Sequence, residues 1–159
     1  LLPYWGRDSR VRTTQINWRR NMADKMSIIV FSGTMDKLMA AATLATGGAA
    51  MGQDVELFVT FWGLDAFRKE RVRTNMKISS DFAEFAEPMM KAMQEKGVPH
   101  WMDVLYQARE IGNVRVRACS QTMELFGWTL DDLDPIVEEV TGVAVFADEA
   151  SEASINLFI

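Results

Sequence analysis

The fold is decided by residues 26–61, which read MSIIVFSGTMDKLMAAATLATGGAAMGQDVELFVTF. The two ends of this stretch, Met26–Phe31 and Val55–Phe61, are dominated by apolar and β-branched residues, as is typical of strands buried in a parallel sheet. Between them, Leu38 and a series of alanines recur at helical spacing, and Gly52 ends the series. The stretch therefore predicts a strand, a helix and a second parallel strand joined by a right-handed crossover.

The rest of the chain continues this alternation. Apolar residues at helical spacing predict two further helices, one rich in methionine and the other entered through Pro99 and ended by Gly112. Short apolar runs near the C-terminus predict additional strands, the last of them buried. The expected elements are a charged helix over Leu64–Arg73, a loop over Asn75–Ser80, a helix that begins at Asp81 or at Pro88 and ends at Gly97, a helix over Trp101–Ile111, a strand over Val114–Ala118, a helix over Ser120–Phe126, an acidic turn or single helical turn over Leu130–Asp134, a strand over Ile136–Val140, a helix over Val143–Ala153 and a strand over Ile155–Ile159.

Strands that alternate with helices predict an α/β fold. We expect a three-layer sandwich in which a mostly parallel sheet of about four to five strands has helices on both faces and the strand order of flavodoxin-like proteins. A chain of 159 residues that is 48% apolar and 25% charged has the size and composition of one globular domain. No internal repeat or low-complexity tract divides it.

Charge is distributed unevenly along the chain. Residues 1–25 contain six basic and two acidic residues, whereas residues 26–159 contain 11 basic and 20 acidic residues. We therefore treat residues 1–25 as a basic N-terminal extension and residues 26–159 as the domain. An acidic domain argues against a nucleic-acid ligand, since phosphate neutralisation needs a basic face. The origin of the extension stays open, because Met22 and Met26 stand just before the first strand.

Two features bear on cellular location. The longest uncharged stretch, Leu38–Gln53, is too short to span a membrane, and no apolar segment follows the early arginines as a secretory signal would require. The single cysteine cannot form an internal disulfide, which fits a reducing compartment. We expect a cytoplasmic protein without a membrane span.

That cysteine, Cys119, stands between the strand pattern of Val114–Ala118 and the helix pattern of Ser120–Phe126. A thiolate at such a position faces unpaired backbone N–H groups and the positive end of the helix dipole. The dipole alone contributes only ~0.3–1 kcal/mol, less than one pKa unit, so activation needs a further group. Strand alternation places Arg117 on the same side as Cys119 and makes it the candidate cation. The alternatives are a buried inert thiol and an arginine that is solvated or paired with a carboxylate.

Other candidate residues follow from the rule that the carboxyl ends of parallel strands share one edge of a sheet. The turn Ser32-Gly33-Thr34 could cradle an anion, but it lacks the further glycines of a dinucleotide fingerprint and more simply caps a helix. His100 is the only histidine, and no metal site or cofactor is expected. We expect one crevice, with these residues in supporting roles beside Cys119: Arg117, Ser32, Gly33, Trp62, Gly63 and Ser120.

Several separated segments resemble the DsrE-like family of sulfur-transfer proteins, in the subgroup of the second DsrE type. The resemblance covers residues 26–159 and is carried by IIVFSGTMDKLMAA (28–41), GGAAMGQDVELFVTFWGLDAFRK (47–69), VRVRACSQTMELFGWTLDDL (114–133) and GVAVFADEASEASINLFI (142–159). It implies a persulfide on Cys119, a role in sulfur oxidation or relay, a homo-oligomer, and partners such as TusA-like or rhodanese-like sulfur carriers. The chain departs from relatives that have a second cysteine, which removes any intramolecular resolving step.

Two functions from different classes are therefore carried forward. The first is a sulfur-transfer protein that exchanges sulfane sulfur with partner thiols, and whether it counts as an enzyme or as a carrier stays open. The second is an oligomeric, non-catalytic binding or scaffold module with an incidental cysteine. A nucleotide-binding, flavodoxin-like protein is disfavoured by the poor phosphate loop.

Overall fold

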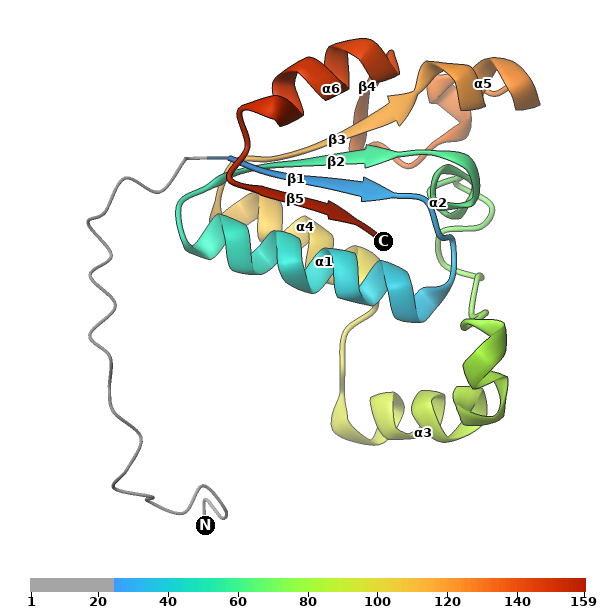
Figure 1. The fold of residues 1–159 in the computed structure, drawn as a ribbon. Coiled ribbons are helices and arrows are strands. Elements are labelled where there is room, and N and C mark those ends of the chain that lie inside the picture. Colours follow the sequence, from blue (N-terminus) through green and yellow to red (C-terminus); the bar gives the residue numbers. More distant parts are fainter. Residues whose placement is uncertain (1–24) are drawn as a thin grey trace, which may run out of the picture.

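The structure is a computed structural model that describes residues 25–159, so the predicted extension lies outside the described residues except for Lys25. Five parallel strands form one sheet, and helices cover both of its faces (Figure 1). This arrangement confirms the predicted α/β sandwich. The strands are β1 (Lys25–Val30), β2 (Asp54–Val59), β3 (Val114–Cys119), β4 (Val137–Thr141) and β5 (Ile155–Phe158), and the helices are α1 (Met35–Ala50), α2 (Phe61–Ala66), α3 (Ala86–Lys96), α4 (Trp101–Ile111), α5 (Ser120–Phe126) and α6 (Val143–Ser151), with short 3₁₀ helices η1 (Ser80–Phe85) and η2 (Leu130–Asp132).

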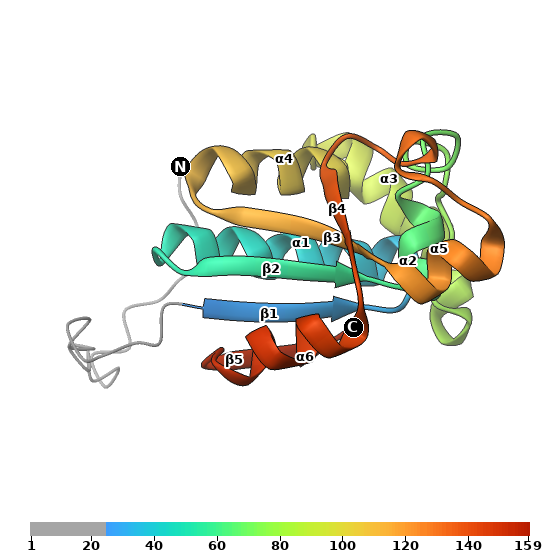
Figure 2. The same cartoon turned by 90° about the horizontal axis from the view of Figure 1, so that it is seen from above.

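The predicted flavodoxin-like strand order is wrong. The order is β4-β3-β2-β1-β5, so the chain adds strands in one direction from β1 to β4 and then returns across the sheet to β5 (Figure 2). Right-handed crossovers on one face of a sheet advance in one direction. Helices α1 and α4 lie on the same face, whereas α6 crosses the opposite face (Figure 1). Amphipathic spacing shows that a helix packs on a sheet but does not show on which face it lies.

Small side chains let α1 lie close to the sheet. The buried face of α1 includes Leu38, several alanines and Gly48, and a Cβ on Gly48 would lie 2.8 Å from Cγ2 of Val55 on β2. On the same side of the core, the ring of Trp101 on α4 meets that of Phe67 edge-on, with 5.0 Å between centroids. Tight packing of this kind makes the core sensitive to a single added methyl group.

Two predicted elements differ from the structure. The expected charged helix over Leu64–Arg73 is absent: α2 ends at Ala66, and turns follow in which Asp65 pairs with Arg68 and Arg71. The turns nevertheless bury Phe67 and Val72 in the core. The final strand is not buried on both faces, because β5 is an edge strand with alternate residues exposed, and Phe158 is 68% exposed.

Within residues 25–159, no helix combines the length and apolar character that crossing a bilayer requires.

Two adjacent glycines of α1 provide a matched test of this packing. A Cβ on Gly47 would meet nothing within 4 Å, so Gly47→Ala is expected to stabilise the protein by about 0.5–1 kcal/mol through helix propensity. Gly48→Ala is expected to destabilise it by about 1–3 kcal/mol, because the methyl group collides with Val55. Urea unfolding of both variants measures the difference. Equal effects at the two positions would contradict the close approach of α1 to β2.

Candidate functional site

Cys119 lies where β3 ends and α5 begins, as the sequence predicts. It is the N-cap residue of α5, with extended backbone angles (φ −70°, ψ 118°), and it pairs with Thr141 of β4 in the ladder. The residue is only 4% exposed. Its cover is aromatic: Cys119 clusters with Phe58 of β2 and Phe146 of α6, whose rings stack with 4.6 Å between centroids.

The surroundings of Cys119 lower the pKa of its thiol. Burial raises the pKa of Cys119, but hydrogen bonding from the Thr60 hydroxyl, from the backbone and side chain of Thr122 and from the backbone of Gln121 outweighs burial, so the pKa lies below its ordinary value. Thr122 is the third residue of α5, so two of its contributions come from the first turn of the helix. At a given pH the thiolate fraction of Cys119 is therefore larger than that of an unperturbed cysteine.

The two threonines also contact each other. The Oγ1 atoms of Thr60 and Thr122 lie 3.0 Å apart, and both residues are buried. The backbone N–H of Phe61 donates a hydrogen bond of 3.1 Å to Oγ1 of Thr122. Phe61 has φ 45°, the one positive φ of a non-glycine residue among the described residues. The hydroxyl pair thus joins the residue after β2 to the first turn of α5, the helix that Cys119 caps.

Arg117 is on the predicted side of β3, but its charge is used elsewhere. Its guanidinium pairs with Glu56 of β2 and Glu149 of α6. Glu56 is 1% exposed and also faces Lys25 at 3.7 Å and Arg115 at 3.8 Å. Arg117 therefore belongs to an ion-pair cluster around the buried Glu56 and does not serve the thiol; the cluster consists of Lys25, Glu56, Arg115, Arg117 and Glu149. A buried carboxylate such as Glu56 needs these cations.

The residues predicted to line one crevice do not all lie around the same cavity. Ser32, Gly33 and Trp62 line a polar cavity of about 240 Å³, whereas Cys119 is not among its lining residues. Gly33 and Gly63 act through close packing: a Cβ on Gly33 would collide with the carbonyl of Trp62, and one on Gly63 with the carbonyl of Val30. The Oγ of Ser120 lies near Gly142, the N-cap residue of α6, and so borders the cover of Cys119.

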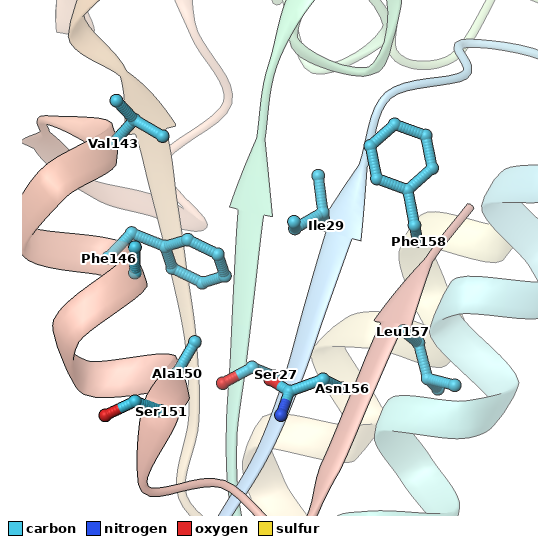
Figure 3. A pocket seen from close by; sticks show the side chains of 10 residues that line it. Ser27, Ile29, Val143, Phe146, Ala150, Ser151, Asn156, Leu157 and Phe158 are labelled. Carbon is cyan, nitrogen blue, oxygen red and sulfur yellow. The ribbon is translucent and has the colours of Figure 1, made fainter.

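A second, apolar groove lies on the α6 face of the sheet. It has a volume of about 430 Å³ and runs between α6 and strands β1 and β5 (Figure 3). Phe146 belongs both to the wall of this groove and to the cluster around Cys119, so one aromatic side chain separates the two. At one end of the groove, Ser27 and Asn156 are neighbours across the β1–β5 ladder, and the Oγ of Ser27 has no hydrogen-bond partner in the described structure.

Sequence reasoning did not single out Thr60, Thr122 or Phe146. Thr60 follows the end of β2, so it lies at the edge that the carboxyl ends of the strands share, and the sequence could have indicated it. Thr122 lies in the first turn of the helix that Cys119 caps. Phe146 gives no such signal, because its position over the thiol depends on the path of α6 across the sheet. His100, the only histidine of the sequence, caps α4 by accepting a hydrogen bond from the backbone N–H of Met102 on Nδ1.

Comparison with known proteins gives consistent matches along the described chain. A model of the DsrE/DsrF/DrsH-like family matches residues 22–83 and 73–158. The uncharacterized protein YrkE of Bacillus subtilis (strain 168) is 33% identical, over 85% of this chain and 96% of its own length. The sulfur carrier protein DsrE2 of Allochromatium vinosum is 26% identical, over 85% of this chain and 98% of its own.

A solved structure has the same fold. The protein of unknown function MTH1491 from Methanobacterium thermoautotrophicum matches with a TM-score of 0.53 at 14% sequence identity, and the match covers 85% of this chain and 98% of that one. At 14% identity this similarity is evidence only for a shared fold.

The ion-pair cluster predicts a large cost for removing Arg117. Arg117→Gln leaves Glu56 buried without its main partner, and we expect a loss of about 3–5 kcal/mol in the free energy of unfolding. The double variant Arg117→Gln, Glu56→Gln removes both charges and should recover most of this loss, as measured by urea unfolding. An unchanged stability in Arg117→Gln would show that the pair does not hold β2 and β3 together.

The aromatic cover predicts that access to Cys119 depends on Phe146. Phe146→Ala removes a buried ring worth about 3 kcal/mol of packing, and alkylation of Cys119 by iodoacetamide is expected to become one to two orders of magnitude faster. Phe158→Ala is the matched control, because Phe158 lines the groove without belonging to the thiol cluster. An unchanged rate in Phe146→Ala, or an equal gain in the control, would contradict this role.

Proposed function

Because this chain belongs to the DsrE/DsrF/DrsH-like family, we propose that it is a sulfur-transfer protein that carries sulfane sulfur as a persulfide on Cys119. Support comes from the relative whose name is sulfur carrier protein DsrE2, which is 26% identical over nearly its whole length. The single observation that carries the proposal is the position of the thiol. The one cysteine of the sequence ends β3 at the carboxyl edge of the sheet and caps α5, and its pKa lies below the ordinary value.

Loading is a thiol exchange. The Cys119 thiolate attacks the outer sulfur of a donor persulfide, so that a new S–S bond forms at Cys119 while the S–S bond of the donor breaks. The donor leaves as a thiolate, and Cys119 becomes Cys119–S–SH with the proton on the outer sulfur. The oxidation level of the transferred sulfur does not change, so no external oxidant is needed.

Release repeats the exchange in the opposite direction. A thiolate of the acceptor attacks the outer sulfur of Cys119–S–SH, the acceptor becomes a persulfide, and Cys119 leaves as a thiolate. Because the chain contains one cysteine, it cannot resolve the persulfide internally. Both partners must therefore supply their own thiols. Cytoplasmic sulfur carriers of the TusA-like or rhodanese-like kind meet this requirement in a sulfur oxidation or relay pathway.

Access is the main structural condition on this proposal. Cys119 is 4% exposed, so a partner thiol reaches the sulfur only after its cover opens. The cover is α6, which has Phe146 as its one buried residue. A partner that displaces α6 or turns the ring of Phe146 would expose the sulfur, and the docked partner would then replace the lost shielding from water.

A non-catalytic binding module is the second candidate. The observations that favour it are the burial of Cys119 and the apolar groove of about 430 Å³ beside α6 (Figure 3). In this case the groove holds an apolar partner segment or a further copy of the chain in a homo-oligomer, and the thiol is a packing residue.

Sulfur loading separates the two candidates. The full chain is incubated with inorganic polysulfide, and intact-mass spectrometry is expected to show one added sulfur atom that is removed by a thiol reductant. The modified peptide should contain Cys119, and Cys119→Ser should add nothing. If wild type gains no sulfur, or if Cys119→Ser gains as much as wild type, the sulfur-transfer proposal is wrong. The binding module is then the remaining candidate.

A further inference from the structure

We infer that the apolar groove beside α6 binds an uncharged amphiphile, a small molecule with an apolar body and one uncharged hydrogen-bonding group that pairs with Ser27 (Figure 3). The volume of the groove, about 430 Å³, lies within the range of roughly 300–1,000 Å³ that is typical of sites for small organic molecules. Cys119 is not among the residues that line the groove, so this inference does not depend on sulfur transfer.

The walls of the groove favour an apolar body. Side chains alternate along β1, so Ser27 and Ile29 face α6, whereas Ile28 belongs to the core on the opposite face of the sheet. The other walls are α6 and β5, and two of their apolar side chains, Val143 and Phe158, are 62% and 68% exposed. A ligand that covers these side chains removes apolar surface from water, which favours binding.

One buried polar group of the groove has no partner. Ser27 is 1% exposed, and its Oγ forms no hydrogen bond in the described structure. Its neighbour in the β1–β2 ladder, Glu56, accepts from Arg117 instead. Its neighbour in the β1–β5 ladder, Asn156, donates from Nδ2 to the carbonyl of Ala153 at 3.3 Å. A buried hydroxyl without a partner costs free energy, so a ligand group that pairs with Ser27 gains the hydrogen bond that the protein leaves unmade.

The lining also indicates that the ligand is neutral. None of the described residues that line the groove carries a charge, and the polar ones are Ser27, Ser151 and Asn156. Lys25 precedes Ser27 on the same side of β1, but its Nζ donates to the carbonyl of Glu149 at 2.8 Å and belongs to the ion-pair cluster. A charged group in the groove would therefore be buried without a counter-charge, which is costly. A hydroxyl or carbonyl group needs none.

The first test compares three probes that share one octyl chain: 1-octanol, octanoate and octylamine. Each is titrated into the full chain below the concentration at which it forms micelles, and binding is followed by ¹H–¹⁵N NMR. We expect 1-octanol to bind about tenfold more tightly than either charged probe and to shift the backbone signals of Ser27 and Asn156. Equal affinity for the three probes, no binding of 1-octanol, or shifts confined to residues outside the groove would overturn the inference.

The second test removes the hydroxyl that the ligand uses. Ser27→Ala should lower the affinity for 1-octanol about three- to tenfold, and it should fold at least as well as wild type because the lost hydroxyl has no partner. Ser151→Ala is the matched control, since Ser151 also lines the groove but its hydroxyl already donates to the carbonyl of Asp148 at 2.6 Å. An unchanged affinity in Ser27→Ala, or an equal loss in Ser151→Ala, contradicts the role of Ser27.

The third test fills the groove. Ala147 and Ala144 are both exposed on α6, but only Ala147 lines the groove. Ala147→Trp should therefore weaken 1-octanol binding at least tenfold, whereas Ala144→Trp should leave it unchanged. Equal affinities in the two variants overturn the inference. If wild type does not bind 1-octanol and Ala147→Trp alone changes the oligomeric mass in light scattering, the groove is a contact between copies of the chain and the inference is wrong.

The groove inference and the sulfur-transfer proposal are tested separately. Cys119→Ser is expected to bind 1-octanol as tightly as wild type does, because Cys119 does not line the groove. If wild type binds 1-octanol but gains no sulfur from polysulfide, only the sulfur-transfer proposal is wrong. If wild type gains sulfur but does not bind 1-octanol, only the groove inference is wrong.

Discussion

The architecture depends on a carboxylate that is buried in the middle of the sheet. Glu56 is removed from water between β1 and β3, and an isolated charge there would be too costly to fold around. Its partners come from Lys25 on β1, from Arg115 and Arg117 on β3 and, through Arg117, from Glu149 on α6. The cluster thus joins three strands to the helix that crosses them. Helix α6 buries a single residue, Phe146, so the pairing of Glu149 with Arg117 is a second tie between this helix and the sheet.

The position of α6 then determines the surroundings of the thiol. Phe146 lies over Cys119 only because α6 crosses this part of the sheet, and the same crossing leaves a groove towards β1 and β5 (Figure 3). The charged Arg117 and the thiol of Cys119 therefore have different partners, although both lie on β3. Arg117 pairs with Glu149 of α6, while the sulfur two residues later lies beneath Phe146 of the same helix.

Local patterns in the sequence predicted much of this structure. The buried β1, the small-residue face of α1 and the place of Cys119 between β3 and α5 all follow from apolar periodicity and helix-ending glycines. Strand alternation also predicted the side on which Arg117 lies. Its partner could not be predicted, since the choice of Glu56 depends on the register between β2 and β3. The hydroxyl pair depends on the turn at Phe61, where one backbone angle ends the strand earlier than its apolar composition indicates.

The cover over Cys119 also has a consequence for oxidation. A disulfide between two copies of the chain requires their cysteine Cα atoms to approach to roughly 7 Å or less. A sulfur that is 4% exposed beneath α6 does not permit that approach in this conformation. An exposed thiol with no internal partner would be open to covalent dimerisation. Burial beneath Phe146 keeps the thiols of colliding copies apart.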